Sequence, residues 1–205
     1  MRYLARLLLL PLFLIPNTTR DDLHEIVLNI PETDGHMIGK YDSIIQAATD
    51  KHLPTGYDWR LFKAQLWQES KMDPHAKSPV GALGIPQFMP ATWGEWAPKA
   101  GYPKAARTDP EASIFTAAMY MANLIDGWYW ERPDADRYCL AMASFNAGFG
   151  NLLKAQKRVG GKALYADIIS GLPQVTGFNS LETINYVRKI LDYCAGQVTG
   201  EYFND

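Results

Sequence analysis

Glu69 is the residue whose type and position most clearly indicate chemistry. It follows Trp59, Phe62 and Leu66 at intervals of three and four residues, which is the spacing that places side chains on one face of a helix. Burying an ionised carboxylate on an apolar face is costly, and the negative end of the helix dipole adds to that cost. Both effects raise the pKa of a carboxyl group. Glu69 is therefore predicted to be an acid able to donate a proton near neutral pH. The competing interpretation is a Glu at the rim of the helix that points into water.

The segment that follows, residues 78–93, is rich in Gly and Pro but apolar between them. Gly81 and Gly84 permit backbone conformations or close approaches that a side chain would block, and the prolines prevent a long helix. Gln87 and Thr92 are its main hydrogen-bonding side chains after the first residue. A rigid apolar loop with a few polar groups is typical of the wall of a ligand cleft. A buried structural crossover is the alternative.

Four blocks of this sequence resemble the catalytic signature of the soluble lytic transglycosylase family. They are Q-E-S at residues 68–70, the Gly/Pro-rich block at 76–92, A-S-F-N-A-G at 143–148 and E-T-I-N-Y-V at 182–187. The family reads E-S, S-x-x-G-A-x-G-L-M-Q, M-P-x-T, A-Y-N-A-G and E-T-x-x-Y-V, and the match runs from about residue 41 to 194. That family shares its fold with goose-type lysozyme, so the resemblance implies a mostly α chain forming a single lysozyme-like helical domain.

The resemblance implies cleavage of peptidoglycan between N-acetylmuramic acid and N-acetylglucosamine. Most glycosidases use two carboxylates, whereas this family uses a single Glu, first as acid and then as base, and forms a 1,6-anhydro product. Glu69 is expected to take both roles. A hydrolytic muramidase like goose-type lysozyme is the alternative reaction, and an inactive wall-binding domain is a third interpretation.

The matching blocks also assign residues around Glu69. The residues expected to contact substrate are Ser70, Ser78, Gln87, Met89, Phe145, Asn146 and Tyr186. The alternative role of Asn146 is to hold the loop, and that of Met89 and Tyr186 is to pack in the core. Glu182 is expected to support the active site, and its alternative role is in a capping box with Asn179 at the start of a helix.

Phe145 departs from the family, which has Tyr at this position. The resemblance implies that Glu69 loses one polar contact here and holds its proton more tightly. Alternatively, Tyr102, Tyr120 or Tyr138 supplies a hydroxyl from elsewhere in the chain.

The elements that must position these residues are predicted to be helices, because hydrophobic residues recur with helical periods and no alternating strand pattern is found. The predicted helices cover about 37–53, 58–70, 110–128, 136–146, 149–157 and 179–194. Asp58 and Asp109 are suitable N-caps, and Pro110 suits the first helical position.

The N-terminus has the layout of an export signal. Arg2 and Arg6 precede and flank an apolar run at residues 7–15, which is shorter than the roughly 20 residues of a membrane-spanning helix. Residues 1–16 are predicted to be a signal peptide or a signal-anchor, 17–36 a linker, and 37–205 the catalytic domain. The protein is therefore expected to be exported to the periplasm or cell envelope, with membrane attachment through the N-terminal segment as one outcome.

Charge and residue composition limit the kinds of partner and cofactor that are expected. A net charge of −2 implies no strong electrostatic attraction to nucleic acid. The four His residues show no metal-ligand spacing, so no metal or other cofactor is expected. The expected partner is the peptidoglycan glycan strand. The protein itself is expected to belong to a phage virion, to a secretion-system assembly or to the enzymes of wall remodelling. Cys139 and Cys194 form a disulfide if the protein is exported and their helices adjoin; otherwise both are small buried residues.

Overall fold

The computed structural model describes residues 39–199, and the side chains as far as Cys194. Helices are its regular elements, and within those residues no strand is found beyond isolated bridges of Leu83 with Lys77 and Phe88. The helices are α2 (Asp42–His52), α3 (Trp59–Ser70), α4 (Pro90–Lys99), α5 (Pro110–Gly127), α6 (Asp134–Ala147), α7 (Phe149–Arg158), α8 (Tyr165–Gly171), α9 (Pro173–Thr176) and α10 (Asn179–Thr199). The predicted mostly α class is confirmed.

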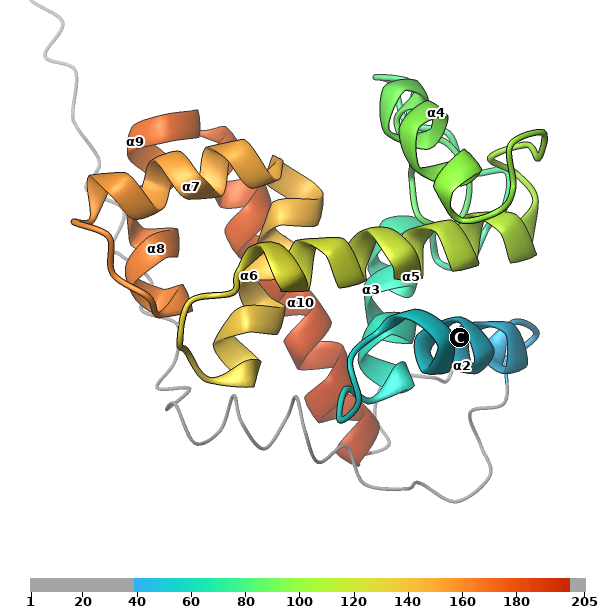
Figure 1. Cartoon of the computed structure of the whole chain (residues 1–205), viewed down its shortest axis with the longest axis horizontal. Helices are drawn as coiled ribbons and strands as arrows, with labels where there is room; N and C mark the ends of the chain where they lie inside the picture. Colours follow the sequence, from blue (N-terminus) through green and yellow to red (C-terminus); the bar gives the residue numbers. More distant parts are fainter. Residues whose placement is uncertain (1–38, 200–205) are drawn as a thin grey trace, which may run out of the picture.

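Helix α5 crosses the middle of the molecule (Figure 1) and packs against α2, α4 and α6. Its buried face is rich in alanine, which lets neighbouring helices approach closely. Helix α10 packs against α3, α6 and α9. The C-terminal end of α3 is therefore held by a helix that lies more than a hundred residues later in the chain.

The helix starts follow local physical chemistry. The Asp58 carboxylate accepts a 2.8 Å hydrogen bond from the Arg60 backbone N–H at the start of α3. At the start of α5, Asp109 accepts one of 3.0 Å from the Ala112 N–H, and Pro110 occupies the first turn. These side chains satisfy backbone donors that a helix leaves free at its N-terminus. Both predicted caps are confirmed.

Three helices were not predicted from the sequence. Helix α4 begins at Pro90, a residue interpreted as a breaker, although proline is well suited to the first turn of a helix. Helices α8 and α9 have 7 and 4 residues, too few to show a helical period. Helix α10 begins at Asn179 itself, so Asn179 lies inside the helix rather than at the N-cap position.

The predicted signal and linker segments, residues 1–36, lie outside the described residues. No helix in the described part of the chain is long and apolar enough to cross a membrane. Cys139 on α6 and Cys194 on α10 are both buried and are not bonded to each other. They serve here as small core residues, although their two helices adjoin.

Candidate active site

Glu69 lies in the last turn of α3, where the helix changes from buried to partly exposed. Gln65 and Leu66 are fully buried, whereas Glu69 and Ser70 retain contact with solvent. The hydroxyl of Tyr186, on α10, donates a 2.6 Å hydrogen bond to Glu69 Oε1. The packing of α3 against α10 therefore fixes one oxygen of the Glu69 carboxyl group.

The pKa of Glu69 is raised from 4.5 to about 7. Burial is the largest cause, and the negative charge of Glu182 raises the pKa further, while the hydrogen bond from Tyr186 lowers it. Burial and a like charge disfavour the ionised form, and a donor stabilises it. The direction of this shift and its main cause, burial, agree with the prediction from the sequence.

Tyr186 is buried, with 5% of its surface exposed. Its predicted role was contact with substrate, but its hydroxyl is directed to Glu69. Glu69 therefore has a tyrosine hydroxyl as a partner although position 145 is Phe. The hydroxyl comes from Tyr186 and not from Tyr102, Tyr120 or Tyr138, the alternatives considered from the sequence.

The end of α6 contributes packing and one hydrogen bond. The ring of Phe145 lies 5.3 Å from that of Tyr120 and 6.1 Å from that of Phe88, centroid to centroid. Asn146 Oδ1 accepts a 2.7 Å hydrogen bond from the Thr183 hydroxyl. This bond joins the C-terminal end of α6 to the first turns of α10, which carry Glu182.

Ser78 and Gln87 both hold the shape of the Gly/Pro-rich loop. Ser78 Oγ accepts a 3.0 Å hydrogen bond from the Ala82 N–H. Gln87 has a positive φ of 52°, and its amide Nε2 donates to the carbonyls of Ala76 and Gly84 at 3.0 and 2.9 Å. The Gln87 donor predicted to bind substrate is therefore occupied within the loop.

Arg107 is a further residue of this loop that the sequence did not indicate. Its guanidinium donates to the carbonyls of Gly81 at 2.9 Å and Phe88 at 2.7 Å. Gly84, with φ of +84°, lies so close that a Cβ would meet Arg107 O at 2.1 Å. An arginine 19 positions after Phe88 has no spacing signal that could have identified it.

The remaining predicted residues lie near this end of α3 or on the loop. The Ser70 hydroxyl is buried and has no hydrogen-bond partner within the described part of the chain. Met89 is 41% exposed at the N-cap of α4. Glu182 is exposed and acts on Glu69 through its charge.

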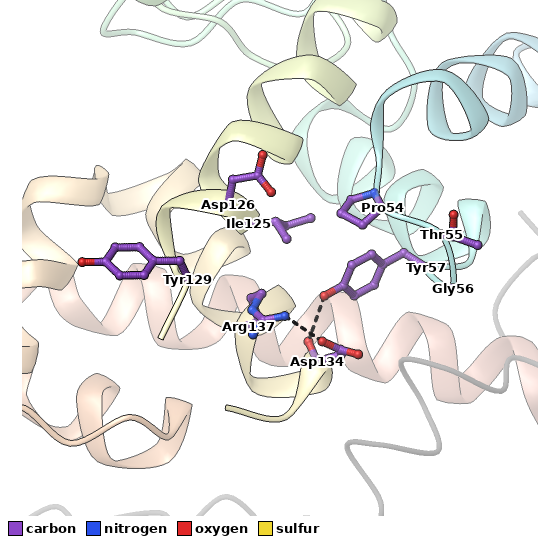
Figure 2. Close-up of a pocket in the computed structure, with 9 residues that line it drawn as sticks. All are labelled: Pro54, Thr55, Gly56, Tyr57, Ile125, Asp126, Tyr129, Asp134 and Arg137. Carbon is purple, nitrogen blue, oxygen red and sulfur yellow. Dashed lines mark hydrogen bonds and ion pairs between the residues drawn. The ribbon is translucent and has the colours of Figure 1, made fainter. Parts of the chain in front are cut away.

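A pocket of about 450 Å³ lies elsewhere, between the α2–α3 loop and the ends of α5 and α6 (Figure 2). Its residue Tyr57 precedes α3, while Glu69 closes the same helix, and a rise of about 1.5 Å per residue separates them by roughly 18 Å. This pocket is therefore not the site of Glu69. The described residues contain no group of three His, Cys, Asp or Glu side chains able to hold a metal ion.

Comparison with known proteins gives consistent results. Residues 43–168 match the model of the family described as the transglycosylase SLT domain. Membrane-bound lytic murein transglycosylase F of Maricaulis maris is 33% identical over 175 residues, covering 76% of this chain and 36% of that protein. The protein of the same name from Yersinia enterocolitica is 30% identical over 151 residues, covering 66% of this chain and 30% of that protein. The chain thus spans roughly a third of the length of these relatives.

Solved structures show the same fold. An inactive Glu-to-Gln mutant of lytic transglycosylase Slt from Pseudomonas aeruginosa superposes with a TM-score of 0.62 at 25% identity, covering 78% of this chain and 24% of that one. The 70 kDa soluble lytic transglycosylase of Escherichia coli also gives 0.62, at 24% identity, covering 89% of this chain and 26% of that one. The lysozyme-like helical fold expected from the sequence is confirmed.

Proposed function

Because this chain belongs to the transglycosylase SLT domain family, we propose that it is a peptidoglycan lytic transglycosylase with Glu69 as its catalytic acid and base. The observation that carries the proposal is the Glu69 carboxyl group, whose pKa of about 7 lets it exchange a proton in either direction near neutral pH. A group that must first donate and then accept a proton works best when its pKa lies near the working pH.

In the first step, protonated Glu69 gives its proton to the glycosidic oxygen between N-acetylmuramic acid and N-acetylglucosamine. The bond from that oxygen to C1 of the muramic acid breaks, and the bonding electrons leave with the oxygen. In the second step, the Glu69 carboxylate accepts the proton of the C6 hydroxyl of the same muramic acid. The C6 oxygen then bonds to C1 and closes the 1,6-anhydro ring, so no water is consumed.

Tyr186 and Glu182 set the balance between these steps. When Glu69 has lost its proton, the Tyr186 hydroxyl donates to a full negative charge, and such charge-assisted hydrogen bonds are stronger than neutral ones. Glu182 acts in the opposite direction, because its negative charge disfavours a second one on Glu69. The two together support an acid that ionises during the reaction and recovers its proton afterwards.

The other predicted residues have proposed roles on the substrate side. Met89 exposes an apolar side chain suited to the face of a sugar ring, whereas the Ser70 hydroxyl is buried and is proposed to support the end of α3 beneath the substrate. Phe145 and Asn146 shape the end of α6, and Ser78 and Gln87 keep the loop in position.

We place the enzyme in the cell envelope, where relatives named membrane-bound transglycosylases support attachment to a membrane. Residues 1–16 are proposed to direct export, either as a cleaved signal peptide or as a retained signal-anchor. N-terminal sequencing of the exported protein distinguishes these, because cleavage leaves a new N-terminus after about residue 16. Copurification from phage particles or from a secretion apparatus would assign it instead to one of those assemblies.

Product analysis tests the proposed reaction. Purified sacculi are digested with the protein, and the soluble muropeptides are identified by mass spectrometry. Products ending in 1,6-anhydro-muramic acid are expected, and Glu69→Gln should form none. Reducing ends without anhydro products would instead identify a hydrolytic muramidase. An effect on cell walls that survives Glu69→Gln unchanged would identify a wall-binding domain.

A further inference from the structure

The pocket at the opposite end of α3 has the size of a ligand site. It encloses about 450 Å³, within the range of about 300–1,000 Å³ typical of sites for small ligands. Tyr57 lines it from the α2–α3 loop, and Asp126 and Arg137 lie beside it (Figure 2). Tyr129 lines the far edge just after α5, with its ring directed outward. Aromatic walls with a few polar groups are typical of binding sites.

The polar groups of this pocket are partly fixed. Arg137 Nη1 pairs with Asp134 Oδ1 at 2.8 Å, and its Nε donates to the Trp128 carbonyl at 3.2 Å. The Tyr57 hydroxyl donates to the Asp134 carbonyl at 3.4 Å. These contacts hold the guanidinium and the tyrosine ring in place before any ligand arrives.

Asp126 is the charged residue of the pocket lining that has no fixed contact. It is exposed, and the described part of the chain gives it no hydrogen bond or ion pair. Because Asp134 already neutralises Arg137, Asp126 leaves the pocket with a net negative charge. An anionic ligand such as a phosphate is therefore disfavoured, whereas a neutral ligand with hydroxyl or amide donors suits a free carboxylate.

Exposed aromatic surface continues outside the pocket. Tyr129 is 74% exposed and Trp130 is 65% exposed, and their ring centroids lie 5.8 Å apart. Two large aromatic side chains side by side in water are costly unless a partner covers them, and such patches mark interaction sites. Pyranose rings fit this surface, because one ring face presents C–H groups to the aromatic rings while the hydroxyls at the ring edge reach polar groups.

We propose that this pocket and the adjoining Tyr129–Trp130 surface form a second glycan site, which binds a disaccharide-sized stretch of a peptidoglycan strand away from Glu69. The proposal rests on the proposed function, because peptidoglycan supplies neutral amino sugars in a continuous polymer. A strand held here leaves the Glu69 end of α3 free. The protein would thus stay on the insoluble wall between successive cleavages, and a short soluble fragment would gain nothing from the site.

The test separates wall binding from catalysis. In a Glu69→Gln background, cosedimentation with purified sacculi is measured for the parent, for Tyr129→Ala combined with Trp130→Ala, and for Asp126→Asn. With Glu69 intact, turnover of a soluble tetrasaccharide fragment is measured for the same set. Leu153→Ala, which truncates an exposed apolar residue of α7, is the matched control, and thermal unfolding confirms that each variant is folded.

We expect the double aromatic variant to bind sacculi about tenfold more weakly and Asp126→Asn about threefold more weakly, consistent with the energies of aromatic contacts and hydrogen bonds. Tetrasaccharide turnover should stay within about twofold of the parent, because a short fragment does not need the second site, and Leu153→Ala should match the parent in both assays. Sacculus binding that is unchanged in both variants overturns the second site while leaving the proposed function intact. A parent that neither binds sacculi nor cleaves the fragment overturns both.

Discussion

The Tyr186 hydroxyl donates a 2.6 Å hydrogen bond to Glu69 Oε1 across 117 positions of sequence. Glu69 belongs to the Q-E-S block and Tyr186 to the E-T-I-N-Y-V block, and the packing of α3 against α10 brings the two residues together. The contact acts against the two effects that raise the pKa of Glu69, burial and the charge of Glu182. Burial thus raises the proton affinity of the acid most, and two residues of the same helix adjust it in opposite directions.

Tyr186→Phe removes the donor and keeps the ring. Because a hydrogen bond to a charged group is worth about 1.5–3 kcal/mol, the pKa of Glu69 should rise above about 7 by at least about one unit. Carbon-detected NMR titration of the Glu69 carboxyl measures this directly, and the pH optimum of turnover should move in the same direction. Tyr165→Phe, which alters a buried tyrosine of α8, should leave both unchanged. A pKa that stays at its parent value would refute the role of Tyr186.

Glu182→Gln should have the opposite effect. Removing the negative charge that raises the pKa of Glu69 lowers that pKa, so the pH optimum moves down. Since Glu182 is exposed, its effect is screened by salt, and the difference from the parent should shrink between low and high ionic strength. Asp192→Asn, an exposed acid on the same helix, is the control. A shift that is equal in the two variants would indicate only a change in net charge.

The sequence predicted the acid well because its signal is local. The helical spacing aligns Glu69 with Trp59, Phe62 and Leu66, and burial is the largest cause of the raised pKa. The structure encloses α3 on all sides at its middle, because residues 61–66 are all buried, so the predicted single buried face is only part of the burial. The same reasoning located α5 through Asp109 and Pro110. Short-range chemistry of this kind can be read from neighbouring residues.

Contacts between distant segments could not be read in this way. The family pattern gave Tyr186 a place near the site, but its partner depends on how α10 packs on α3. The sequence shows that Phe145 lacks the hydroxyl of the family Tyr, but not that its ring packs against Tyr120 and Phe88. Arg107 was missed because its guanidinium binds backbone carbonyls of the loop, which leave no signature in the sequence.

Gln65 is expected to act on Glu69 through Tyr186. Gln65 is fully buried one helical turn before Glu69, and residues four apart share a helix face. Burial raises the pKa of Tyr186, and the Gln65 amide lowers it. Neither amide atom completes a hydrogen bond in this geometry, so the contact is electrostatic and weaker than that of Tyr186 with Glu69. Gln65→Leu should therefore raise the pKa of Glu69 less than Tyr186→Phe does.

A double-mutant cycle checks that route. If Gln65 acts only by polarising the Tyr186 hydroxyl, Gln65→Leu should have no further effect on the Glu69 pKa once Tyr186 is replaced by Phe. Additive shifts would mean that Gln65 acts on Glu69 independently. Thr49→Val, another change of a buried polar group without a partner, controls for general loss of core polarity and should leave the titration unchanged.

Gly84→Ala should disrupt the loop beside the site. The new Cβ would lie 2.1 Å from Arg107 O, on a residue whose φ is +84°. Gly101→Ala is the matched control, because Gly101 has φ of +95° but open space around a Cβ. The control should lose about 1 kcal/mol of unfolding free energy from backbone strain alone. Gly84→Ala should lose at least about 3 kcal/mol, because the clash displaces backbone as well. Equal losses in urea unfolding would show that the loop relaxes around the new methyl group.

Glu69→Gln should stabilise the fold at alkaline pH while abolishing the proposed activity. The pKa of Glu69 is about 7 in the folded protein against a reference of 4.5, so between these values the folded state binds a proton that the unfolded state has released. The unfolding free energy of the parent protein therefore falls as pH rises through this window. Above about pH 7, the whole destabilisation that comes from burying the ionised Glu69 is present. A shift of this size corresponds to at most about 3 kcal/mol.

Because Glu69 keeps some contact with water, that figure must be reduced for solvent screening, and a gain of about 1–2 kcal/mol at about pH 8.5 is expected. The amide oxygen of the substituted side chain would still accept the Tyr186 hydrogen bond, so Glu69→Gln removes the charge without leaving that donor unpaired. Urea unfolding of both proteins from about pH 4 to about pH 8.5 measures the difference, which should vanish at the acidic end, where the parent carboxyl is protonated in the folded state. A difference that does not change with pH would mean that Glu69 titrates normally and is not held as a neutral acid by its surroundings.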